Sequence, residues 1–322
     1  MSKKKRGRRK WVFGENIKKG PRIPRKKATF AAKVAEKVFS SGKEKKEQVL
    51  DKVLPHSMKV VQLKIFCEGT DNPMGTATAF LATYKENLFL ITNHHVVSGY
   101  YPGSKRILHK SRIAVPGRME MYCRLVKEKG DGSGEWQYET AHMGVDFGQN
   151  GMNGWLEHPE LASKCDIVAI PVDTRLYGDF EGFGFNSIDI EAAIESELDL
   201  NVMDELFITG FPLPIDECYS KLPIYKAGYL ASEPGEYANT ILYVDSKTKP
   251  GMSGSPVIQR ERVRFENKDG GVLITERVIK FVGVYSGRVG VTDIVGEAEL
   301  GIVWPFQEYL VPILENGKKT KR

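Results

Sequence analysis

Short runs of apolar and β-branched residues recur along this chain from about residue 60 onward, and Gly, Pro, Asn and Asp cluster between them. Runs of this length, bounded by turn-forming residues, are typical of β-strands. The predicted strands cover residues 60–66, 76–83, 88–92, 119–126, 167–172, 206–209, 224–230, 240–244, 256–259, 277–285 and 299–303. So many short strands predict an all-β barrel or sandwich.

The strand pattern is weak or absent in several other regions. Residues 127–157 and 173–203 are acidic or Gly-rich, and we expect them to be long surface loops. Residues 305–314 are expected to form a short closing helix. Residues 1–30 lack periodic hydrophobicity and are predicted to be disordered, whereas apolar positions at helical spacing predict an amphipathic helix within residues 28–54.

Charge divides the chain more sharply than its net charge of +6 indicates. Residues 1–55 carry +14 and the last five residues +4, and subtracting both leaves −12 for residues 56–317. Three interpretations of the basic N-terminal segment are open. It is a solvated extension, it binds nucleic acid through phosphates, or it folds back on the acidic body as an inhibitory or docking segment. Only Trp11 and Phe13 offer aromatic rings there, so recognition of base sequence is not expected.

Several classes of protein are disfavoured by the sequence. No apolar run is long enough to cross a bilayer, and the basic N-terminus lacks the apolar core of a secretory signal. The four cysteines (Cys67, Cys123, Cys165 and Cys218) have no C-x-x-C spacing, so we expect reduced packing residues rather than a metal site or a disulfide framework. These features predict a cytoplasmic protein without a cofactor or a bound metal.

Three candidate catalytic residues stand beside predicted strands, in the order His95, Asp166 and Ser253. This is the chain order of one known solution to nucleophilic acyl transfer. A serine hydroxyl needs a base, which His95 can supply, and Asp166 can hold the imidazole tautomer. Gly251 permits the turn in which its own N–H and that of Ser253 converge on a developing oxyanion.

Each feature alone has an ordinary structural explanation. The Gly-x-Ser-Gly turn is common, His94 and His95 could form a core pair, and Asp166 could cap a buried strand. Their joint occurrence in this order favours catalysis. Asp146 and Asp173 are alternative acids, but only Asp166 opens an apolar strand.

The competing motif is the nucleophile elbow of α/β-hydrolases. That motif requires Gly at its fifth position and places the histidine after the serine. This chain has Ser255 at the fifth position, and His95 precedes Ser253. The α/β-hydrolase interpretation therefore fails on both counts.

Four motifs, at residues 75–80 with 92–96, 165–168, 209–212 and 250–256, resemble those of the chymotrypsin-fold, trypsin-like serine peptidases. The chain is most similar to the disulfide-free intracellular and bacterial group that includes the protease domain of HtrA-type enzymes, without a PDZ domain. The resemblance implies two six-stranded antiparallel β-barrels with the site between them. It makes His95, rather than His94, the base, Asp166 the acid and Ser253 the nucleophile.

The resemblance also implies domain limits and a substrate pocket. The basic extension would span residues 1–57, the peptidase domain 58–316 (barrels at roughly 58–175 and 200–316), and a basic tail 317–322. The expected pocket residues are Lys247, Thr248, Ser286, Gly287 and Arg288. Thr248 with Lys247 or Arg288 would suit an acidic or polar side chain, and a small aliphatic pocket is the alternative.

The function expected from these features is a serine endopeptidase acting on protein or peptide substrates. Met252 stands where digestive relatives carry the Asp that pairs with a newly cut N-terminus, so that activation step is not expected. The alternative is a nucleic-acid-binding or partner-binding protein that uses the peptidase fold as a scaffold, or a polyprotein-processing protease. The complete triad together with Gly251 favours the endopeptidase.

Overall fold

The computed structural model describes residues 54–67, 70–107, 116–128, 136–145, 153–173, 184–212, 222–235, 241–266, 272–288 and 300–320. The helix expected within residues 28–54 falls almost wholly outside these ranges, as do Asp146 and Cys218. The three interpretations of the basic segment, nucleic-acid binding by residues 1–55 among them, also concern residues outside these ranges. Within the described ranges, no helix is long and apolar enough to span a membrane.

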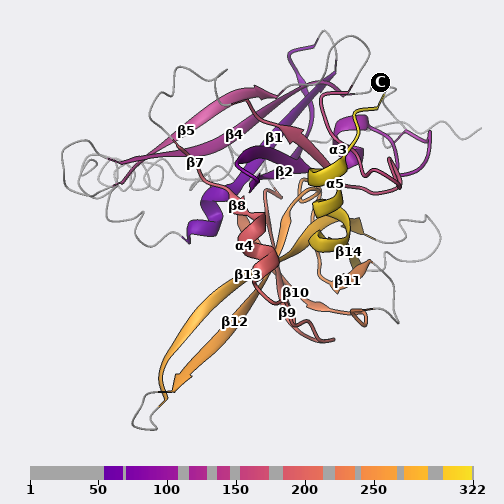
Figure 1. Ribbon diagram of the computed structural model, residues 1–322. Helices are drawn as coiled ribbons and strands as arrows, with labels where there is room; N and C mark the ends of the chain where they lie inside the picture. Colours follow the sequence, from indigo (N-terminus) through magenta and orange to yellow (C-terminus); the bar gives the residue numbers. More distant parts are fainter. Residues whose placement is uncertain are drawn as a thin grey trace, which may run out of the picture. The chain divides into compact units, whose positions relative to one another are not determined.

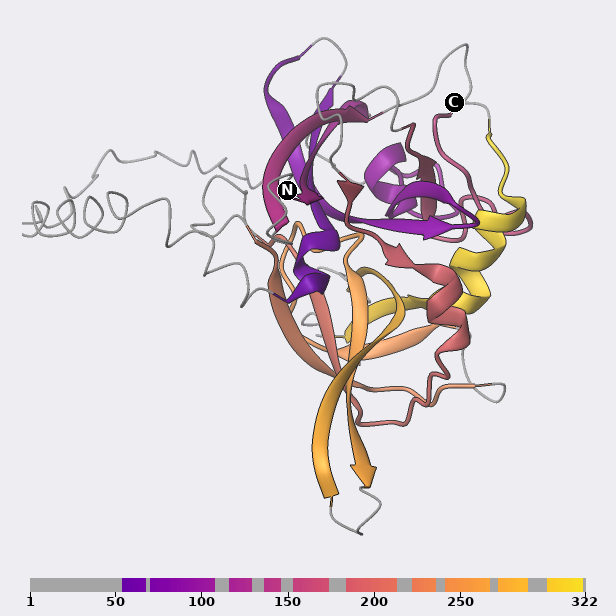
Figure 2. The ribbon, with the colours of Figure 1, turned by 60° about the vertical axis from the view of Figure 1, so that its left-hand side comes forward.

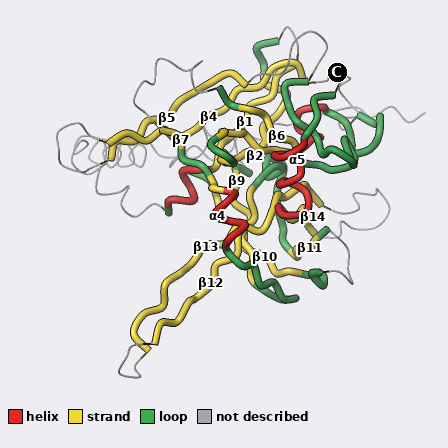
Figure 3. The backbone as a smooth tube through the Cα atoms, viewed as in Figure 1, coloured by secondary structure: helices red, strands yellow, loops and turns green. Residues whose placement is uncertain are grey.

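Antiparallel strands make up most of the body that begins at Leu54, and its helices are short (Figures 1 and 3). The strands are β1 (Val60–Cys67), β2 (Pro73–Tyr84), β3 (Asn87–Thr92), β4 (Pro116–Glu128), β5 (Trp136–Val145), β6 (Val168–Pro171), β7 (Gly184–Phe185), β8 (Ile188–Asp189), β9 (Glu205–Gly210), β10 (Ile224–Leu230), β11 (Leu242–Asp245), β12 (Pro256–Glu266), β13 (Val272–Arg288) and β14 (Leu300–Pro305). The helical elements are η1 (Pro55–Lys59), α3 (His94–Ser98), α4 (Ile190–Glu195), η4 (Phe306–Leu310) and α5 (Val311–Asn316).

The N-terminal half is a curled sheet in the strand order β5-β4-β1-β2-β3-β6, with β7 paired to β4 and β8 to β2. Successive side chains of a strand point to opposite faces, and β2 follows this rule closely. Ala77, Ala79 and Leu81 pack into the core of the curled sheet. Phe80 and Ala82, on the other face, join a second cluster that is shared with the C-terminal half.

The C-terminal half is a closed six-stranded barrel in the order β10-β11-β14-β13-β12-β9. Its core is mostly aliphatic, and it includes Met252 and Tyr285 from segments next to the candidate nucleophile. Beyond the barrel, β12 and β13 continue as a paired ribbon that projects away from it in both views (Figures 1 and 2).

An aromatic cluster holds the two halves together. Phe80 of β2 packs edge-on against Phe281 of β13 with ring centroids 5.4 Å apart, and Phe281 lies 5.1 Å from Phe306 of η4. Trp304 and Tyr309 meet edge-on at 4.8 Å in the same cluster. The closing helix expected at residues 305–314 is therefore present as η4 and α5, and it packs at this junction.

The all-β prediction with a barrel-type sheet in each half is confirmed by this topology. The C-terminal half is the closed six-stranded barrel that was predicted, whereas the N-terminal half is a curled sheet of eight strands rather than a closed barrel of six. Two predicted loops were wrong in part. Region 127–157 contains β5, and region 173–203 contains β7, β8 and α4. Strand β5 lies at the sheet edge and reads Trp-Gln-Tyr-Glu-Thr-Ala-His-Met-Gly-Val, so it lacks the apolar run of a central strand. Helix α4 is short, and its cap, in which Asp189 accepts from the Ala192 N–H at 3.0 Å, is a weak sequence signal.

We expect Phe80→Ala to lower the free energy of unfolding by about 3–5 kcal/mol, because the Phe80 side chain is fully buried at the junction and its removal leaves a cavity. Urea unfolding would measure this change. Tyr229→Ala, an aromatic truncation on a strand at 56% exposure, is the matched control and should change stability by less than about 1 kcal/mol. Equal effects of the two variants would contradict the packing described here.

The η1 turn buries His56, and burial, assisted by Lys59, lowers the pKa of His56 from 6.5 to about 4. Above pH 6.5 both folded and unfolded states hold this histidine neutral, so it has no effect on stability. Between pH 6.5 and about 4 only the unfolded state gains the proton, so this group destabilises the fold by up to about 3 kcal/mol. His56→Asn should therefore unfold with a shallower loss of stability over that pH range, and an unchanged slope would contradict the burial.

Candidate active site

The segment that carries the two histidines is fixed from its first residue. Strand β3 ends at Thr92, and Asn93 takes an extended conformation before the single turn of α3 begins. The buried Asn93 amide donates to the carbonyl of Asp166 at 2.7 Å. Gly99, with φ of 76°, ends the turn and donates its N–H to the His95 carbonyl. The Asn93 bond thereby joins the end of β3 to the segment that precedes β6.

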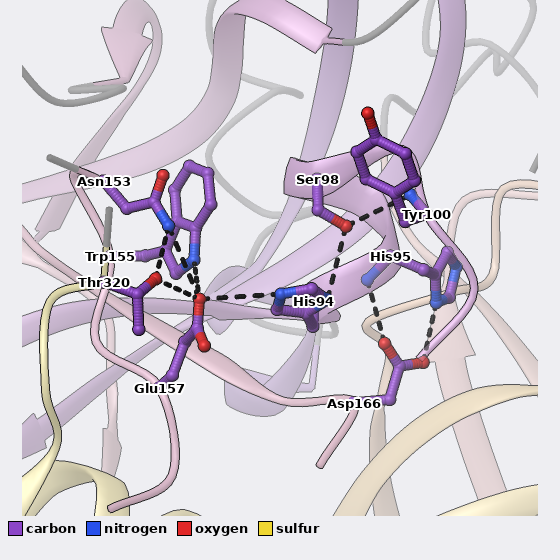
Figure 4. A network of polar contacts seen from close by, with 9 residues as sticks. All are labelled: His94, His95, Ser98, Tyr100, Asn153, Trp155, Glu157, Asp166 and Thr320. Atoms are coloured by element: carbon purple, nitrogen blue, oxygen red, sulfur yellow. Dashed lines mark hydrogen bonds and ion pairs between the residues drawn. The ribbon is translucent and has the colours of Figure 1, made fainter. Parts of the chain in front are cut away.

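His95 and Asp166 form a close pair (Figure 4). Asp166 accepts from the His95 backbone N–H at 2.9 Å through Oδ1, and its Oδ2 lies 2.6 Å from His95 Nδ1. The Ser286 hydroxyl, from β13 of the other barrel, also donates to Oδ2. The Asp166 side chain is 1% exposed, so these three donors replace the water it has lost.

This contact settles the tautomer of His95 when Asp166 is ionised. A carboxylate is only an acceptor, so Nδ1 carries the shared proton. The other ring nitrogen, Nε2, is then left as an acceptor. That is the arrangement in which an imidazole can take a proton from a nucleophile.

His94 is turned the other way. Its Nε2 lies 3.6 Å from the carboxylate of Glu157, and its Nδ1 lies 3.3 Å from the hydroxyl of Ser98 (Figure 4). Two consecutive histidines thus face different carboxylates: His94 faces Glu157, and His95 contacts Asp166.

The turn around Ser253 depends on two glycines with left-handed φ, Gly251 at 94° and Gly254 at 85°. A Cβ on Gly251 would come within 2.4 Å of the Phe211 carbonyl, and one on Gly254 within 2.1 Å of the Thr78 carbonyl. No side chain fits at either position. The N–H groups of Gly251 and Ser253 donate to no other backbone group of the described chain.

Thr78 of β2 ties this turn to the histidine segment. Its N–H donates to the Ser253 carbonyl at 2.9 Å and its hydroxyl to the Gly251 carbonyl at 2.7 Å. The same hydroxyl accepts from the Phe211 N–H at 2.9 Å, and the Thr78 carbonyl accepts from the Thr92 hydroxyl at 2.9 Å. One residue of the first half thereby holds the Ser253 turn and the end of the strand that leads to His95.

Ser253 itself makes no side-chain hydrogen bond to His95 within the described part of the chain. The structure thus brings His95 and Asp166 into contact and holds the Ser253 turn beside them through Thr78.

The expected pocket residues occupy different environments. Thr248 is buried, and its hydroxyl contacts the hydroxyl of Tyr285. The Tyr285 ring packs so closely on Gly301 that a Cβ added there would come within 2.6 Å of the ring. Burial raises the pKa of Tyr285, against smaller opposing effects of Thr248 and Arg288. Lys247 is exposed, and Gly287 follows a register shift in β13. Ser286 was expected to face substrate, but its hydroxyl donates to Asp166.

Sequence reasoning did not assign roles to Thr78, Asn93 or Tyr285. Thr78 lies on the face of β2 that otherwise presents Phe80 and Ala82, and a polar residue on an apolar face was the available signal. Asn93 stands inside a quoted motif, but its amide contact crosses 73 residues of sequence. No local pattern pairs Tyr285 with Thr248.

The described cysteines are packing residues. Cys67, Cys123 and Cys165 are free thiols, and burial raises the pKa of Cys123 and that of Cys165 to about 12 each. A thiol with such a pKa is a poor nucleophile near neutral pH. Among the described residues, no group of three or more His, Cys, Asp or Glu side chains could hold a metal ion.

No protein-family model matches the chain, and no curated protein does. Similar solved structures are serine proteases. The Rv3671c protease of M. tuberculosis H37Rv, in its inactive form, is 14% identical, with a TM-score of 0.37 over 80% of this chain and 89% of that chain. A thermostable serine protease, AL20, from an extremophilic microorganism is 9% identical, with a TM-score of 0.40 over 82% of this chain and 100% of that chain. A Glu endopeptidase is 15% identical, with a TM-score of 0.42 over 79% and 89%.

Because these scores are low, the fold is assigned from the curled sheet and the closed barrel of this chain. The chain has the chymotrypsin-type fold. Its curled sheet supplies His95 and Asp166, and its closed barrel supplies the Ser253 turn and Ser286. The HtrA-type subgroup stays a prediction.

We expect Thr78→Val to destabilise the protein by about 1–3 kcal/mol, because the Gly251 carbonyl and the Phe211 N–H each lose a partner. Thr78→Ser keeps the hydroxyl and should retain most of that stability. Urea unfolding of both variants would test this expectation. If Val and Ser variants are equally stable, Thr78 does not hold the turn through these bonds.

Proposed function

We propose that this protein is a serine endopeptidase in which His95, Asp166 and Ser253 form the catalytic triad. The observation that carries the proposal is the buried contact between His95 Nδ1 and Asp166 Oδ2 at 2.6 Å, which leaves Nε2 as an acceptor. The Ser253 turn, tied to the same part of the structure by Thr78, supports Ser253 as the nucleophile.

In the proposed reaction the Ser253 Oγ attacks the carbonyl carbon of the scissile bond while its proton passes to His95 Nε2. The C–N bond then breaks, and Nε2 returns that proton to the departing amine. Water attacks the resulting acyl-enzyme ester with His95 again as base, and Ser253 regains its proton. Asp166 stays ionised and stabilises the imidazolium formed in each half-reaction.

The negative charge that develops on the carbonyl oxygen would be bound by the N–H groups of Gly251 and Ser253. Neither N–H is used by another backbone group of the described chain, which supports this role. A pre-positioned donor of this kind is worth about 3–4 kcal/mol of transition-state stabilisation. The left-handed φ of Gly251 keeps its N–H in the turn without a Cβ striking the Phe211 carbonyl.

Proteins or peptides are the proposed substrates. The pocket proposed for the side chain before the scissile bond includes Lys247, Thr248, Gly287 and Arg288, as expected from the sequence. The hydroxyls of Thr248 and Tyr285, which contact one another, add hydrogen-bonding capacity beside it. A polar or acidic side chain fits this chemistry better than an aliphatic one.

A fluorophosphonate probe would test the nucleophile. We expect a covalent adduct on Ser253, detected by mass spectrometry, that is absent from Ser253→Ala and from His95→Ala. Ser253→Ala should unfold within about 0.5 kcal/mol of the wild type, because Ser253 is only half-buried and the change removes a single oxygen atom.

Ser104→Ala, at an exposed turn, is the matched control and should label like the wild type. A peptide blocked at both ends would distinguish endopeptidase from exopeptidase activity. Labelling of the Ser253→Ala variant at the wild-type rate would contradict the assignment.

A further inference from the structure

A second buried carboxylate, Glu157, lies on the far side of the histidine segment from Asp166 (Figure 4). Glu157 is only 4% exposed. One oxygen, Oε1, accepts from the Trp155 indole N–H at 3.1 Å, the Thr320 hydroxyl at 2.7 Å and, more distantly, the Asn153 amide at 3.4 Å. The proposed reaction makes no use of this group.

Glu157 is held in its ionised form. Burial alone would raise its pKa, but the nearby His94 ring, at 3.6 Å, and hydrogen bonds from Thr320 and Trp155 outweigh burial and lower the pKa below its ordinary value. A buried negative charge strongly favours an arrangement in which all of its donors stay in place. The donors therefore form one network rather than separate contacts.

The C-terminal segment supplies one side of this network. Lys318 and Glu157 exchange backbone hydrogen bonds of 3.0 and 3.1 Å, and the Thr320 carbonyl accepts from the Asn153 N–H at 3.0 Å. The Asn153 amide also donates to the Thr320 hydroxyl at 2.7 Å. The segment thus lies antiparallel to residues 153–157, joined to them by a β-bridge between Lys318 and Glu157, and its last described residue donates directly to the buried carboxylate.

His94 forms the opposite side. Its Nε2 lies 3.6 Å from Glu157 Oε1, and its Nδ1 is held by Ser98, one turn further along α3. The ring therefore anchors the first turn of the helix on the side away from Asp166. Because His94 and His95 are consecutive, a change in the backbone at residue 94 also moves the residue that contacts Asp166.

We propose that Glu157 and Thr320 are positioning residues for His95, acting through His94. Asp166 holds the histidine segment from one side through the His95 N–H and Nδ1, and Glu157 holds it from the other through His94. The C-terminal segment thereby sets the geometry of the base. This inference deepens the proposed serine-peptidase function and rests on it for its kinetic consequence, although the geometry itself does not depend on catalysis.

Two pairs of variants in the full chain test it. Thr320→Val removes the hydroxyl at nearly constant shape, and Thr320→Ser restores it. Glu157→Gln removes the buried charge, and Glu160→Gln makes the same change on an exposed side chain three residues away. Thr320 is only half-buried, so its variants should fold even if Glu157→Gln does not.

The first readout is the rate of fluorophosphonate labelling as a function of pH. We expect Thr320→Val and Glu157→Gln to slow labelling by about 10- to 100-fold, the size of effect that a displaced catalytic group produces. The acid limb of this profile is the pH range in which labelling falls as His95 is protonated. It should shift to lower pH in both variants, because a loosened contact with Asp166 makes the imidazolium form of His95 less favourable. Thr320→Ser and Glu160→Gln should keep the wild-type rate and acid limb.

The second readout needs no activity. The Nδ1 proton that His95 shares with Asp166 should give a proton resonance far downfield in the NMR spectrum, and His95→Ala assigns it by its loss. We expect Thr320→Val to shift or broaden this resonance and Thr320→Ser to leave it in place. If Thr320→Val loses stability in urea while its acid limb and this resonance match the wild type, Thr320 serves only folding and the proposal is overturned.

The two readouts separate the failures of the two proposals. A wild-type protein that is folded but unlabelled would reject the peptidase. The resonance would still decide whether Thr320 positions His95: a shift in Thr320→Val supports the inference, and an unchanged resonance overturns it.

Discussion

The carboxylate of Asp166 is the constraint on which the junction of this protein depends. A carboxylate withdrawn from water must find donors, and a buried one without them is strongly destabilising. Two of its donors come from His95 in the N-terminal half, and the third is the Ser286 hydroxyl from the C-terminal barrel. Full satisfaction of this one group therefore requires both halves to be folded and in register with each other.

Apolar contacts at the junction bring the two halves together. The rings of Phe80, Phe281 and Phe306 bring β2, β13 and η4 together over a large buried area. Such contacts are strong but weakly directional, so they favour association without fixing a register. Direction comes from the polar groups beside them, above all from Thr78, whose hydroxyl and backbone engage the Ser253 turn.

Much of the fold followed from the apolar pattern, because strands such as β1, β3 and β9 are largely buried and read as apolar or alternating runs. Strand β5 escaped prediction because an edge strand meets less of the core and carries Gln137, Glu139 and His142. The order of His95, Asp166 and Ser253 predicts the chemistry that we propose. The residues that contact these segments from elsewhere in the chain could not be predicted. Thr78, Ser286 and Glu157 make contacts between distant segments, and such contacts leave no local pattern in the sequence.

Strand β2 contributes side chains to two separate cores, which limits how its sequence can change in evolution. Alternate residues of β2 fill the curled sheet (Ala77, Ala79 and Leu81) and the junction (Thr78, Phe80 and Ala82). A single inserted or deleted residue here would exchange these two sets, because side-chain direction in a strand has a period of two. The gene segment that encodes β2 should therefore accept substitutions far more readily than changes in length, and its homologues should align there without gaps.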